Sequence, residues 1–470
     1  MRVDSRFTAI SISRPSVRES RFAFNVLSTP FPSERAMSRQ RAIVIGGSMS
    51  GLMAARVLAD HFAEVAVFDR DGFPPSGENR KGVPQGQHAH ALLTSGRQVL
   101  ERYFPGLRDE LFGHGALKGD YRRVRWFDNG VYHTRFDGLE ALLISRPRLE
   151  SHVRERLTAL SNVRINDRRD VDMPAATDGR VTGVTVGGDV ISADLVVDAS
   201  GRGSQSPAWL EKMGFPRPQE EAVKVGLGYT TRIYQRMPDH LKGDLAVICP
   251  SAPPATRGGV ALAMEGDRWM VTLFGMLGDH PPTDEKAFAE FARSLPAPDI
   301  YEAISQAAPL TELTPFRFPQ STRRRYESIA RFPEGYLVFG DAVCSFNPIY
   351  GQGMSSAALQ AAELDTCLAA GDQGLAKRFF TAASKVIDAP WTMAVGGDLR
   401  YEAVAGPRTA MVKFVNWYIG KLHIAAAGDP KVALAFHRVA NLLDPPPSLM
   451  QPGIAFRILQ GNMRKPSTRH

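Results

Sequence analysis

A turn of small residues near position 46 could bind phosphate. It contains Gly46, Gly47, Ser48 and Gly51, and Asp69 follows 18 residues after Gly51. Glycine lets the backbone turn tightly, and the free N–H groups at the start of a helix stabilise the charge of a pyrophosphate. A carboxylate at this spacing can accept hydrogen bonds from a ribose. The residue types and their spacing therefore predict a dinucleotide site.

Three secondary-structure elements are expected to hold this turn. Residues 42–45 form an apolar run typical of a buried parallel strand, residues 50–62 have helical periodicity, and residues 65–68 predict a second strand. This order of strand, turn, helix and strand is the dinucleotide-binding unit, in which Gly51 lets helix and strand pack closely. The middle glycine of the unit is replaced by Ser48, whose small side chain still admits a phosphate and whose hydroxyl can donate to it.

A second glycine-rich turn lies about three hundred residues further along the chain. A buried strand is expected at residues 336–339, and it leads directly into Gly340 and Asp341. A helix is predicted to begin after the turn, so a second helix N-terminus is available to an anion. Asp341, at the end of a buried strand, is placed to bind hydroxyl groups. The helix is expected to begin near Met354, and Gly351, Gln352 and Gly353 precede it.

The remaining sequence changes character twice. Residues 207–330 contain alternating segments and proline-rich loops, which predict an antiparallel sheet inserted as a substrate domain. Apolar stripes at residues 411–422 and 432–442 predict a helical C-terminal region, and both stripes are interpreted as core rather than as membrane-lying faces. The predicted fold class is α/β: a Rossmann-like nucleotide-binding domain with this inserted sheet and C-terminal helices. The expected boundaries are 1–40 for an extension, 41–206 and 331–371 for the nucleotide-binding domain, 207–330 for the substrate domain and 372–470 for the helices.

The composition limits the classes of function. The chain has 470 residues, of which 43% are hydrophobic and 23% charged, as in a globular protein of two or three domains. Its net charge of +8 is diffuse and includes no array of basic and aromatic residues, so no nucleic-acid partner is expected. Three scattered cysteines predict no metal site and fit a reducing compartment, so the cytoplasm is the expected location. No transmembrane span is expected, and a peripheral membrane contact is left open but not favoured.

Residues 1–40 are basic, rich in serine and poor in acid, and they carry no persistent helical or strand pattern. Three interpretations remain open: a disordered tail, an organelle-type presequence, or an upstream mis-start. Met37 stands five residues before the first expected strand, so a mis-start or disorder is favoured over targeting. No secretory signal is visible.

Three motifs occur in this order along the chain: GGSMSG followed by FDR, then DLVVDASGRGS, then GDAVCSFNPIYGQGMS. Together they resemble the single-component FAD-dependent monooxygenases of the para-hydroxybenzoate hydroxylase fold. The segments RKGVPQGQHAH, DASGRGS and NPIYGQGMS look most similar to a branch that contains olefin epoxidases related to squalene epoxidase. The resemblance covers residues 41–371.

The resemblance implies where FAD would lie. The first turn would bind the pyrophosphate and Asp69 the adenosine ribose, while Arg80 and Arg146 match arginines that lie against FAD in relatives. Asp341 would bind the ribityl or phosphate portion, and the second turn would present N–H groups to the isoalloxazine. The residues expected to contact FAD are Gly46, Gly47, Ser48, Gly51, Asp69, Arg70, Arg80, Arg146, Gly340, Asp341, Gly351, Gln352, Gly353 and Met354.

The resemblance also implies the chemistry. Reduced FAD would take up O2 and, through a flavin C4a-hydroperoxide, deliver one oxygen atom to an apolar or aromatic small molecule by hydroxylation or epoxidation. The resemblance implies NAD(P)H as the electron donor, and its binding would be transient because no second dinucleotide unit is visible. Hydroxylation of a phenol needs a base or a hydrogen-bonding group, and no motif identifies one. The candidates considered are Tyr229, His88 and Tyr350.

Departures from the family pattern leave alternatives open. Ser200-Gly201 stands where the family usually has Asp-Gly, so a direct contact of that position with NAD(P)H is not implied. Cys344 is expected as a small buried residue rather than a redox centre. The alternatives in function are an FAD-dependent reductase of isoprenoid double bonds and a flavin-binding protein without turnover. A halogenase is less favoured, because no WxWxIP-type motif is found.

Overall fold

A five-stranded parallel sheet lies at the centre of the nucleotide-binding part. The structure is a computed structural model that describes residues 39–463, and the N-terminal extension discussed above falls outside that range. The strand order is β17-β11-β1-β2-β7, and each pairing is parallel. The expected strands at 42–45, 65–68 and 336–339 are confirmed. The strands are β1 (Arg41–Ile45), β2 (Glu64–Phe68), β7 (Val163–Asn166), β11 (Leu195–Asp198) and β17 (Tyr336–Val338).

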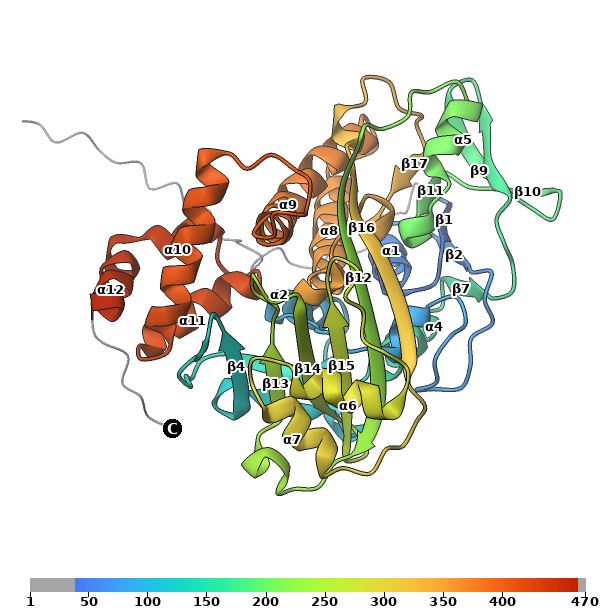
Figure 1. Ribbon diagram of the computed structural model, residues 1–470. Coiled ribbons are helices and arrows are strands. Elements are labelled where there is room, and N and C mark those ends of the chain that lie inside the picture. The colour runs from blue at the N-terminus through green and yellow to red at the C-terminus, as the bar shows by residue number, and fades with distance from the viewer. Residues whose placement is uncertain (1–38, 464–470) are drawn as a thin grey trace, which may run out of the picture. The chain divides into compact units, whose positions relative to one another are not determined.

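Helices pack around this sheet and bring its two glycine turns together (Figure 1). The helix after the first turn, α1, packs against α8, the helix after the second turn, and also against α4. α1 and α8 are therefore neighbours in space although about three hundred residues separate them. The inward positions of α8 are buried alanines and leucines, as its periodicity predicts. The helices are α1 (Met49–Ala59), α2 (Thr94–Tyr103), α3 (Leu107–Gly113), α4 (Arg146–Thr158), α5 (Ser206–Lys212) and α8 (Gly353–Ala369).

An eight-stranded, mostly antiparallel sheet forms the second layer. Its order is β18-β16-β12-β15-β14-β13-β4-β5. The helices α6 (Glu285–Arg293) and α7 (Asp299–Ser305) share a hydrophobic core with the residues of one face, including Trp269 and Val271. The inserted antiparallel sheet is thus confirmed. Its strands are β4 (Val124–Asp128), β5 (Val131–Tyr132), β12 (Glu220–Gln235), β13 (Ala246–Cys249), β14 (Arg257–Met264), β15 (Arg268–Gly275), β16 (Thr314–Arg324) and β18 (Cys344–Ser345).

Both edges of this sheet come from outside residues 207–330. At one edge β4 pairs with β13 in parallel and β5 follows it, while at the other edge β18 pairs with β16. A parallel pairing between distant segments leaves no turn signal in the sequence, so β4 could not be assigned to the sheet from its pattern. The domain boundaries drawn from the sequence stay a prediction.

Two small sheets lie beside these layers. A hairpin turns at Gly187-Gly188, and both glycines have positive φ. The three-stranded sheet contains β8 (Met173–Thr177), β9 (Arg180–Val186) and β10 (Asp189–Ser192), and the two-stranded sheet pairs β3 (Leu117–Asp120) with β6 (Glu140–Leu143).

The C-terminal region is helical, as predicted, but one of its two stripes is not core. Of the stripe in α10, Leu422 is fully buried, whereas Met411 is 66% and Phe414 45% exposed. The core interpretation is wrong for the first half of α10, because α11 and α12 pack against the second half of this helix. Within residues 39–463 every helix is too short or too polar to cross a bilayer. The helices are α9 (Leu375–Asp398), α10 (Ala410–Ala426), α11 (Pro430–Ala440) and α12 (Pro452–Met463).

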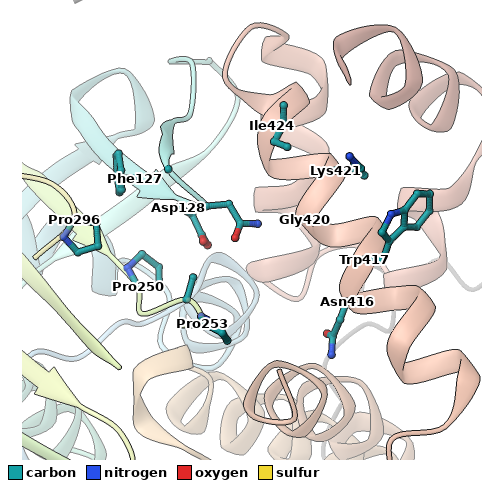
Figure 2. A pocket seen from close by; sticks show the side chains of 13 residues that line it. Phe127, Asp128, Pro250, Pro253, Pro296, Asn416, Trp417, Gly420, Lys421 and Ile424 are labelled. Carbon is teal, nitrogen blue, oxygen red and sulfur yellow. The ribbon is translucent and has the colours of Figure 1, made fainter. Parts of the chain in front are cut away.

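A cleft of about 520 Å³ lies between α10 and the edge of the eight-stranded sheet (Figure 2). Asp128, at the end of β4, lines it from the sheet side, and Pro250 and Pro253 line it from the loop after β13. Trp417 and Ile424 line it from α10. The cleft therefore has a mixed lining, because Asn129, Asn416 and Lys421 add polar groups to these apolar side chains and Asp128 is a buried carboxylate on its sheet side.

Candidate FAD site

The first glycine turn is held by contacts that only glycine permits. Gly46 has a φ of +100°, and its N–H donates to the carbonyl oxygen of Phe68 at 2.7 Å. A Cβ on Gly46 would lie 2.7 Å from the carbonyl oxygen of Ala199, and a Cβ on Gly51 would overlap the carbonyl oxygen of Gly46. The side chain of Ser48 makes no capping bond to α1, so the first N–H groups of the helix can bind an anion.

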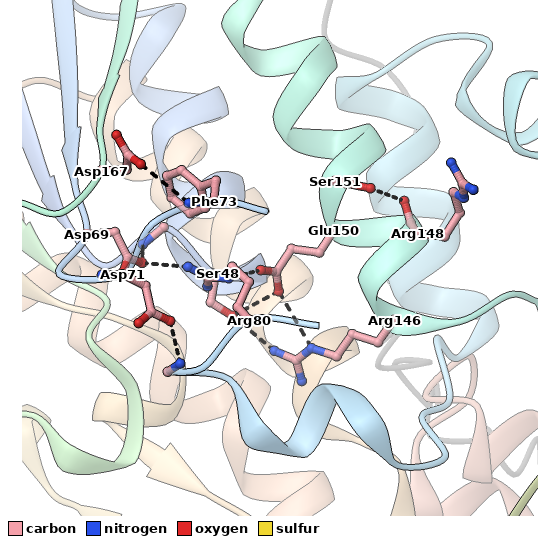
Figure 3. Close-up of polar contacts among 12 residues, drawn as sticks. Ser48, Asp69, Asp71, Phe73, Arg80, Arg146, Arg148, Glu150, Ser151 and Asp167 are labelled. Carbon is pink, nitrogen blue, oxygen red and sulfur yellow. Dashed lines mark hydrogen bonds and ion pairs between the residues drawn. The ribbon is translucent and has the colours of Figure 1, made fainter. Parts of the chain in front are cut away.

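Asp69 faces this turn, as its spacing predicts. Its Oδ2 accepts from the N–H of Gly47 at 2.7 Å and from Nη1 of Arg80 at 3.1 Å (Figure 3). Arg80 is only 6% exposed, and its Nε lies 2.9 Å from Oε1 of Glu150. Arg80 is thus a buried residue that joins two carboxylates beside the turn. A buried arginine fixed on both sides can position a ligand with little further loss of freedom.

Arg146 lies on the other side of the same turn. Its Nη2 donates to Oγ of Ser48 at 3.0 Å, and its Nε lies 3.6 Å from Glu150 (Figure 3). Its Nη1 lies 3.0 Å from Nε2 of His90. The hydroxyl of Ser48 in turn donates to Glu150 at 3.2 Å. Glu150 was not predicted from the sequence, although it stands four residues after Arg146 on one face of α4. Arg70 is exposed and is in none of the ion pairs formed within residues 39–463.

The second glycine turn leads into α8. Gly340 has a φ of +66°, and a Cβ there would lie 2.5 Å from Oγ of Ser50 in the first turn of α1. A Cβ on Gly353, the first residue of α8, would lie 3.7 Å from Oδ1 of Asp341. Asp341 therefore lies beside the N-terminus of α8, and the two turns meet across Gly340. Gly351 also has positive φ, Gln352 is buried, and Met354 is half-buried.

Positive charge lies between the two turns. Burial raises the pKa of Asp341, and the charges of Arg146 and Arg202 oppose that rise. Because Arg146 also contacts Ser48, one guanidinium lies close to both turns. Two helix N-termini, the glycine turns, the buried Arg80 and the partly buried Arg146 together offer groups suited to a dinucleotide with phosphate in its middle.

An aromatic cluster on the eight-stranded sheet faces this region. Nδ1 of His88 lies 2.8 Å from Oγ1 of Thr231, and its ring packs edge-on against Tyr229, which stacks on Phe316. Burial lowers the pKa of His88 to about 4, so this imidazole is neutral at neutral pH. Nε2 of His88 has no hydrogen-bond partner among the described residues and can serve a ligand. Two of the candidate groups considered from the sequence, His88 and Tyr229, therefore lie together.

The third candidate, Tyr350, lies in a different polar cluster. Its hydroxyl donates to Oδ1 of Asp398 at 3.1 Å, and Nδ2 of Asn347 donates to the same oxygen at 2.8 Å. Burial raises the pKa of Asp398 to about 7. Oδ2 of Asp398 is buried without a partner within residues 39–463. Asp398 was missed from the sequence, where its one signal is an acid at the last residue of a helix.

These features define a flavoprotein of the para-hydroxybenzoate hydroxylase fold. The family model described as the FAD binding domain matches residues 39–381. The chain belongs to this FAD-binding family and is an FAD-dependent oxidoreductase.

Relatives and solved structures agree on the fold. Protein Rv3254 of Mycobacterium tuberculosis is 35% identical over 429 residues, which cover 86% of this chain and 90% of the relative. A kynurenine 3-monooxygenase of Salinispora tropica is 25% identical, over 74% of this chain and 77% of the relative. The structure of p-nitrophenol 4-monooxygenase PnpA from Pseudomonas putida has 19% identity and a TM-score of 0.59, covering 87% of this chain and 99% of that one. The flavin-dependent brominase Bmp2 has 14% identity and a TM-score of 0.63, over 90% and 99%.

Proposed function

We propose that this protein is a monooxygenase that uses O2 and NAD(P)H to insert one oxygen atom into an apolar or aromatic small molecule. The fold alone does not select this reaction, because a brominase and a monooxygenase share it. The relative at 25% identity is named a monooxygenase, which supports oxygen insertion. NAD(P)H is proposed as a donor that binds transiently.

FAD is proposed to extend from the first turn to the second. The N-terminus of α1 and Ser48 would hold the pyrophosphate, Asp69 the adenosine ribose, and Arg80 and Arg146 the phosphate charge. Asp341 and the N–H groups at Gly353 and Met354 would hold the ribityl and isoalloxazine end. When bound, FAD supplies the redox chemistry and the activation of O2.

The observation that carries the proposal is the pair of the half-buried Tyr350 and the buried Asp398 next to the second turn. Tyr350 immediately precedes Gly351, so the pair lies beside the proposed flavin end. A carboxyl with a pKa of about 7 is half ionised at neutral pH, which suits a group that accepts a proton from a substrate hydroxyl. Its free Oδ2 can accept that proton while Tyr350 and Asn347 hold Oδ1 in place.

The neutral His88 contributes a second polar contact in an apolar setting. Tyr229 and Phe316 form the apolar surface beside it, and both belong to the sheet opposite the nucleotide turns. An apolar lining of this kind would exclude water and orient a flat ring. The exclusion of water would protect activated oxygen from side reactions before it reaches the substrate. A substrate with an aromatic or olefinic body and one polar group fits this lining.

Anaerobic reduction tests the reaction. NADPH should bleach the flavin absorbance of the purified holoenzyme, and air should restore it. With a substrate, the product should gain one oxygen atom by mass spectrometry. A product that gains two hydrogen atoms instead would identify a reductase and contradict the proposal. If NADPH leaves the spectrum unchanged, the protein binds flavin without this turnover.

A pair of variants tests where FAD lies. Asp341→Ala should sharply lower the flavin retained per protein after gel filtration, because it removes the carboxylate beside α8. Asp109→Ala is the matched control, since the side chain of Asp109 is 80% exposed and distant in the chain from both turns. Equal flavin content in the two variants would contradict this placement.

A further inference from the structure

The C-terminal helices carry a concentration of exposed apolar side chains. We call these exposed side chains the C-terminal apolar surface. Within residues 39–463, nine of the fourteen large hydrophobic residues that are exposed fall in this region. Trp417 is 59% and Phe456 is 60% exposed. The nine residues are Met411, Phe414, Val415, Trp417, Ile424, Met450, Phe456, Leu459 and Met463. A cluster of this kind marks a surface that contacts something apolar.

One side of the first two turns of α10 is uncovered, while Val412 and Asn416 hold the other side to the fold. Met411, Phe414, Val415 and Trp417 belong to none of the three hydrophobic cores. The second half of α10 is packed instead, since Asn462 of α12 donates to its backbone at Lys421 and Tyr418 donates to the backbone at Leu449. The helix is therefore held along its length, and the four apolar side chains are exposed on its uncovered side.

The charge around this surface is positive. Residues 403–463 contain six lysines and arginines and two aspartates, a net charge of +4 out of the +8 of the whole chain. Each aspartate is already paired: Asp429 with Arg457 at 2.8 Å and Asp444 with Arg438 at 2.6 Å. Lys413 and Lys421, both on α10, form no ion pair with any described residue. α10 and α12 contain no acidic residue.

We propose that the C-terminal apolar surface docks on an anionic phospholipid membrane. An amphipathic helix with aromatic residues on one side and lysines beside them lies in the interface of such a membrane, with its apolar side chains among the acyl chains. The lysine stems reach past apolar side chains to the lipid phosphates, which supply the negative charge that this region lacks.

A second copy of the chain fits this surface less well. In a two-fold dimer the same patch meets itself, so Lys413 and Lys421 of one copy would face those of the other without any acid to pair. Burying like charges in this way costs free energy. An anionic lipid surface has no such conflict.

The cleft beside α10 gives the docking a consequence. Trp417 and Ile424 belong both to the C-terminal apolar surface and to the lining of the cleft (Figure 2). Docking would therefore place this cleft at the membrane surface, where an apolar substrate that leaves the bilayer at α10 meets it first. This last step rests on the proposed function, whereas docking does not.

Sedimentation of the full-length holoenzyme with vesicles tests the docking. The protein should bind vesicles of phosphatidylcholine mixed with phosphatidylserine, bind phosphatidylcholine alone several-fold more weakly, and dissociate as salt rises. Trp417 provides a direct signal, because Trp209, Trp269 and Trp391 are buried and Trp126 is half-buried. Its fluorescence should shift to the blue on binding and be quenched by brominated lipid. In Trp417→Phe both signals should be lost.

Matched variants assign the binding to this surface. Phe414→Gln with Trp417→Gln should lower the partition onto anionic vesicles by about tenfold or more. Lys413→Gln with Lys421→Gln should lower it about fivefold per lysine. The controls are Met237→Gln with Leu310→Gln, which are exposed apolar residues elsewhere, and Lys212→Gln with Lys286→Gln.

Three outcomes would overturn the proposal. One is the absence of binding to either kind of vesicle. Another is equal binding by the surface variants and their controls. The third is a dimer in light scattering that Phe414→Gln with Trp417→Gln converts to a monomer, which would assign the surface to a second copy. None of these measurements depends on turnover, so failure of the proposed oxygen insertion would leave the vesicle result intact.

Discussion

Gly51 has the tightest surroundings of the residues in the first turn. A Cβ at this position would overlap the carbonyl oxygen of Gly46, so any side chain must push α1 away from β1. We therefore expect Gly51→Val to lose most of its FAD, as measured by flavin absorbance per protein. Gly113→Val is the control, since Gly113 is exposed at the end of α3 with open space around it. Full flavin content in Gly51→Val would show that the turn does not hold the cofactor.

Asp398 should make stability depend on pH. The folded carboxyl keeps its proton up to about pH 7, whereas the unfolded chain releases it near pH 4. The free energy of unfolding should therefore fall as pH rises through this window, by up to about 4 kcal/mol. We expect Asp398→Asn to remove this decline in denaturant titrations at acid and neutral pH. Asp372→Asn, at a side chain that is 67% exposed, should keep it.

The pH dependence of kcat/KM should follow the ionisation of Asp398. If Asp398 accepts the substrate proton, kcat/KM rises with pH through about 7. The hydroxyl of Tyr350 donates to Asp398 and so lowers its pKa. Tyr350→Phe should therefore move the rise to higher pH, whereas a purely structural tyrosine would change the rate without moving the profile.

Three buried histidines join the C-terminal helices to the edge of the eight-stranded sheet. Nε2 of His133, after β5, lies 3.0 Å from Nδ1 of His423 in α10, and Nδ1 of His133 lies 3.3 Å from Nε2 of His437 in α11. His423 ends the row 3.5 Å from Asp128, with Arg400 also near. Burial lowers the pKa of both His133 and His423 to about 3. The row is therefore neutral at neutral pH.

Acid should loosen this junction before the rest of the fold. Because the folded pKa values lie below the value of about 6.5 in an unfolded chain, the histidines contribute stability above that pH and lose it as pH falls toward 3. Hydrogen exchange of α10 and α11 should accelerate several-fold between about pH 7 and pH 5, after correction for intrinsic rates, while α1 changes little. His133→Gln should weaken this response, and equal acceleration in α1 would contradict it.

The exposure of α10 shows how much structural information a periodic apolar pattern carries. The stripes of α10 and α11 have the same spacing, but Val432 and Val439 of α11 are buried while Met411 and Phe414 are exposed. Periodicity identifies the apolar side of a helix, and only its neighbours decide whether that side is covered. The strand, turn and helix units of the nucleotide-binding part were predictable, because their sequence signals are local and do not depend on distant neighbours.

FAD should act as a structural link across the molecule. If it contacts both turns, removing it with chaotropic salt should lower the melting temperature, and adding it back should restore the holoenzyme value. Arg146→Met should reduce the recovered shift, because Arg146 lies between the turns. Arg148→Met, on the same helix but bonded to Ser76, should not. An unchanged melting temperature after removal would mean that the turns associate without the cofactor.

The sequence placed the two turns correctly but not the contacts that join them. Gly46 and Asp69 are linked by a short segment of known geometry, so their meeting was predictable. Glu150 and Asp398 carry no motif, and they reach the site through the packing of α4 and α9. Their roles required the distances between elements, which depend on the whole fold.

The close approach of Gly340 to Ser50 also bears on the order in which the site assembles during synthesis. The N-terminus of a growing chain leaves the ribosome first, so the first turn is synthesised long before α8. Until α8, which ends at Ala369, has left the ribosome, the side of α1 that α8 will cover faces water. Capture of the cofactor should therefore come late in synthesis, after the eight-stranded sheet has formed between the two halves.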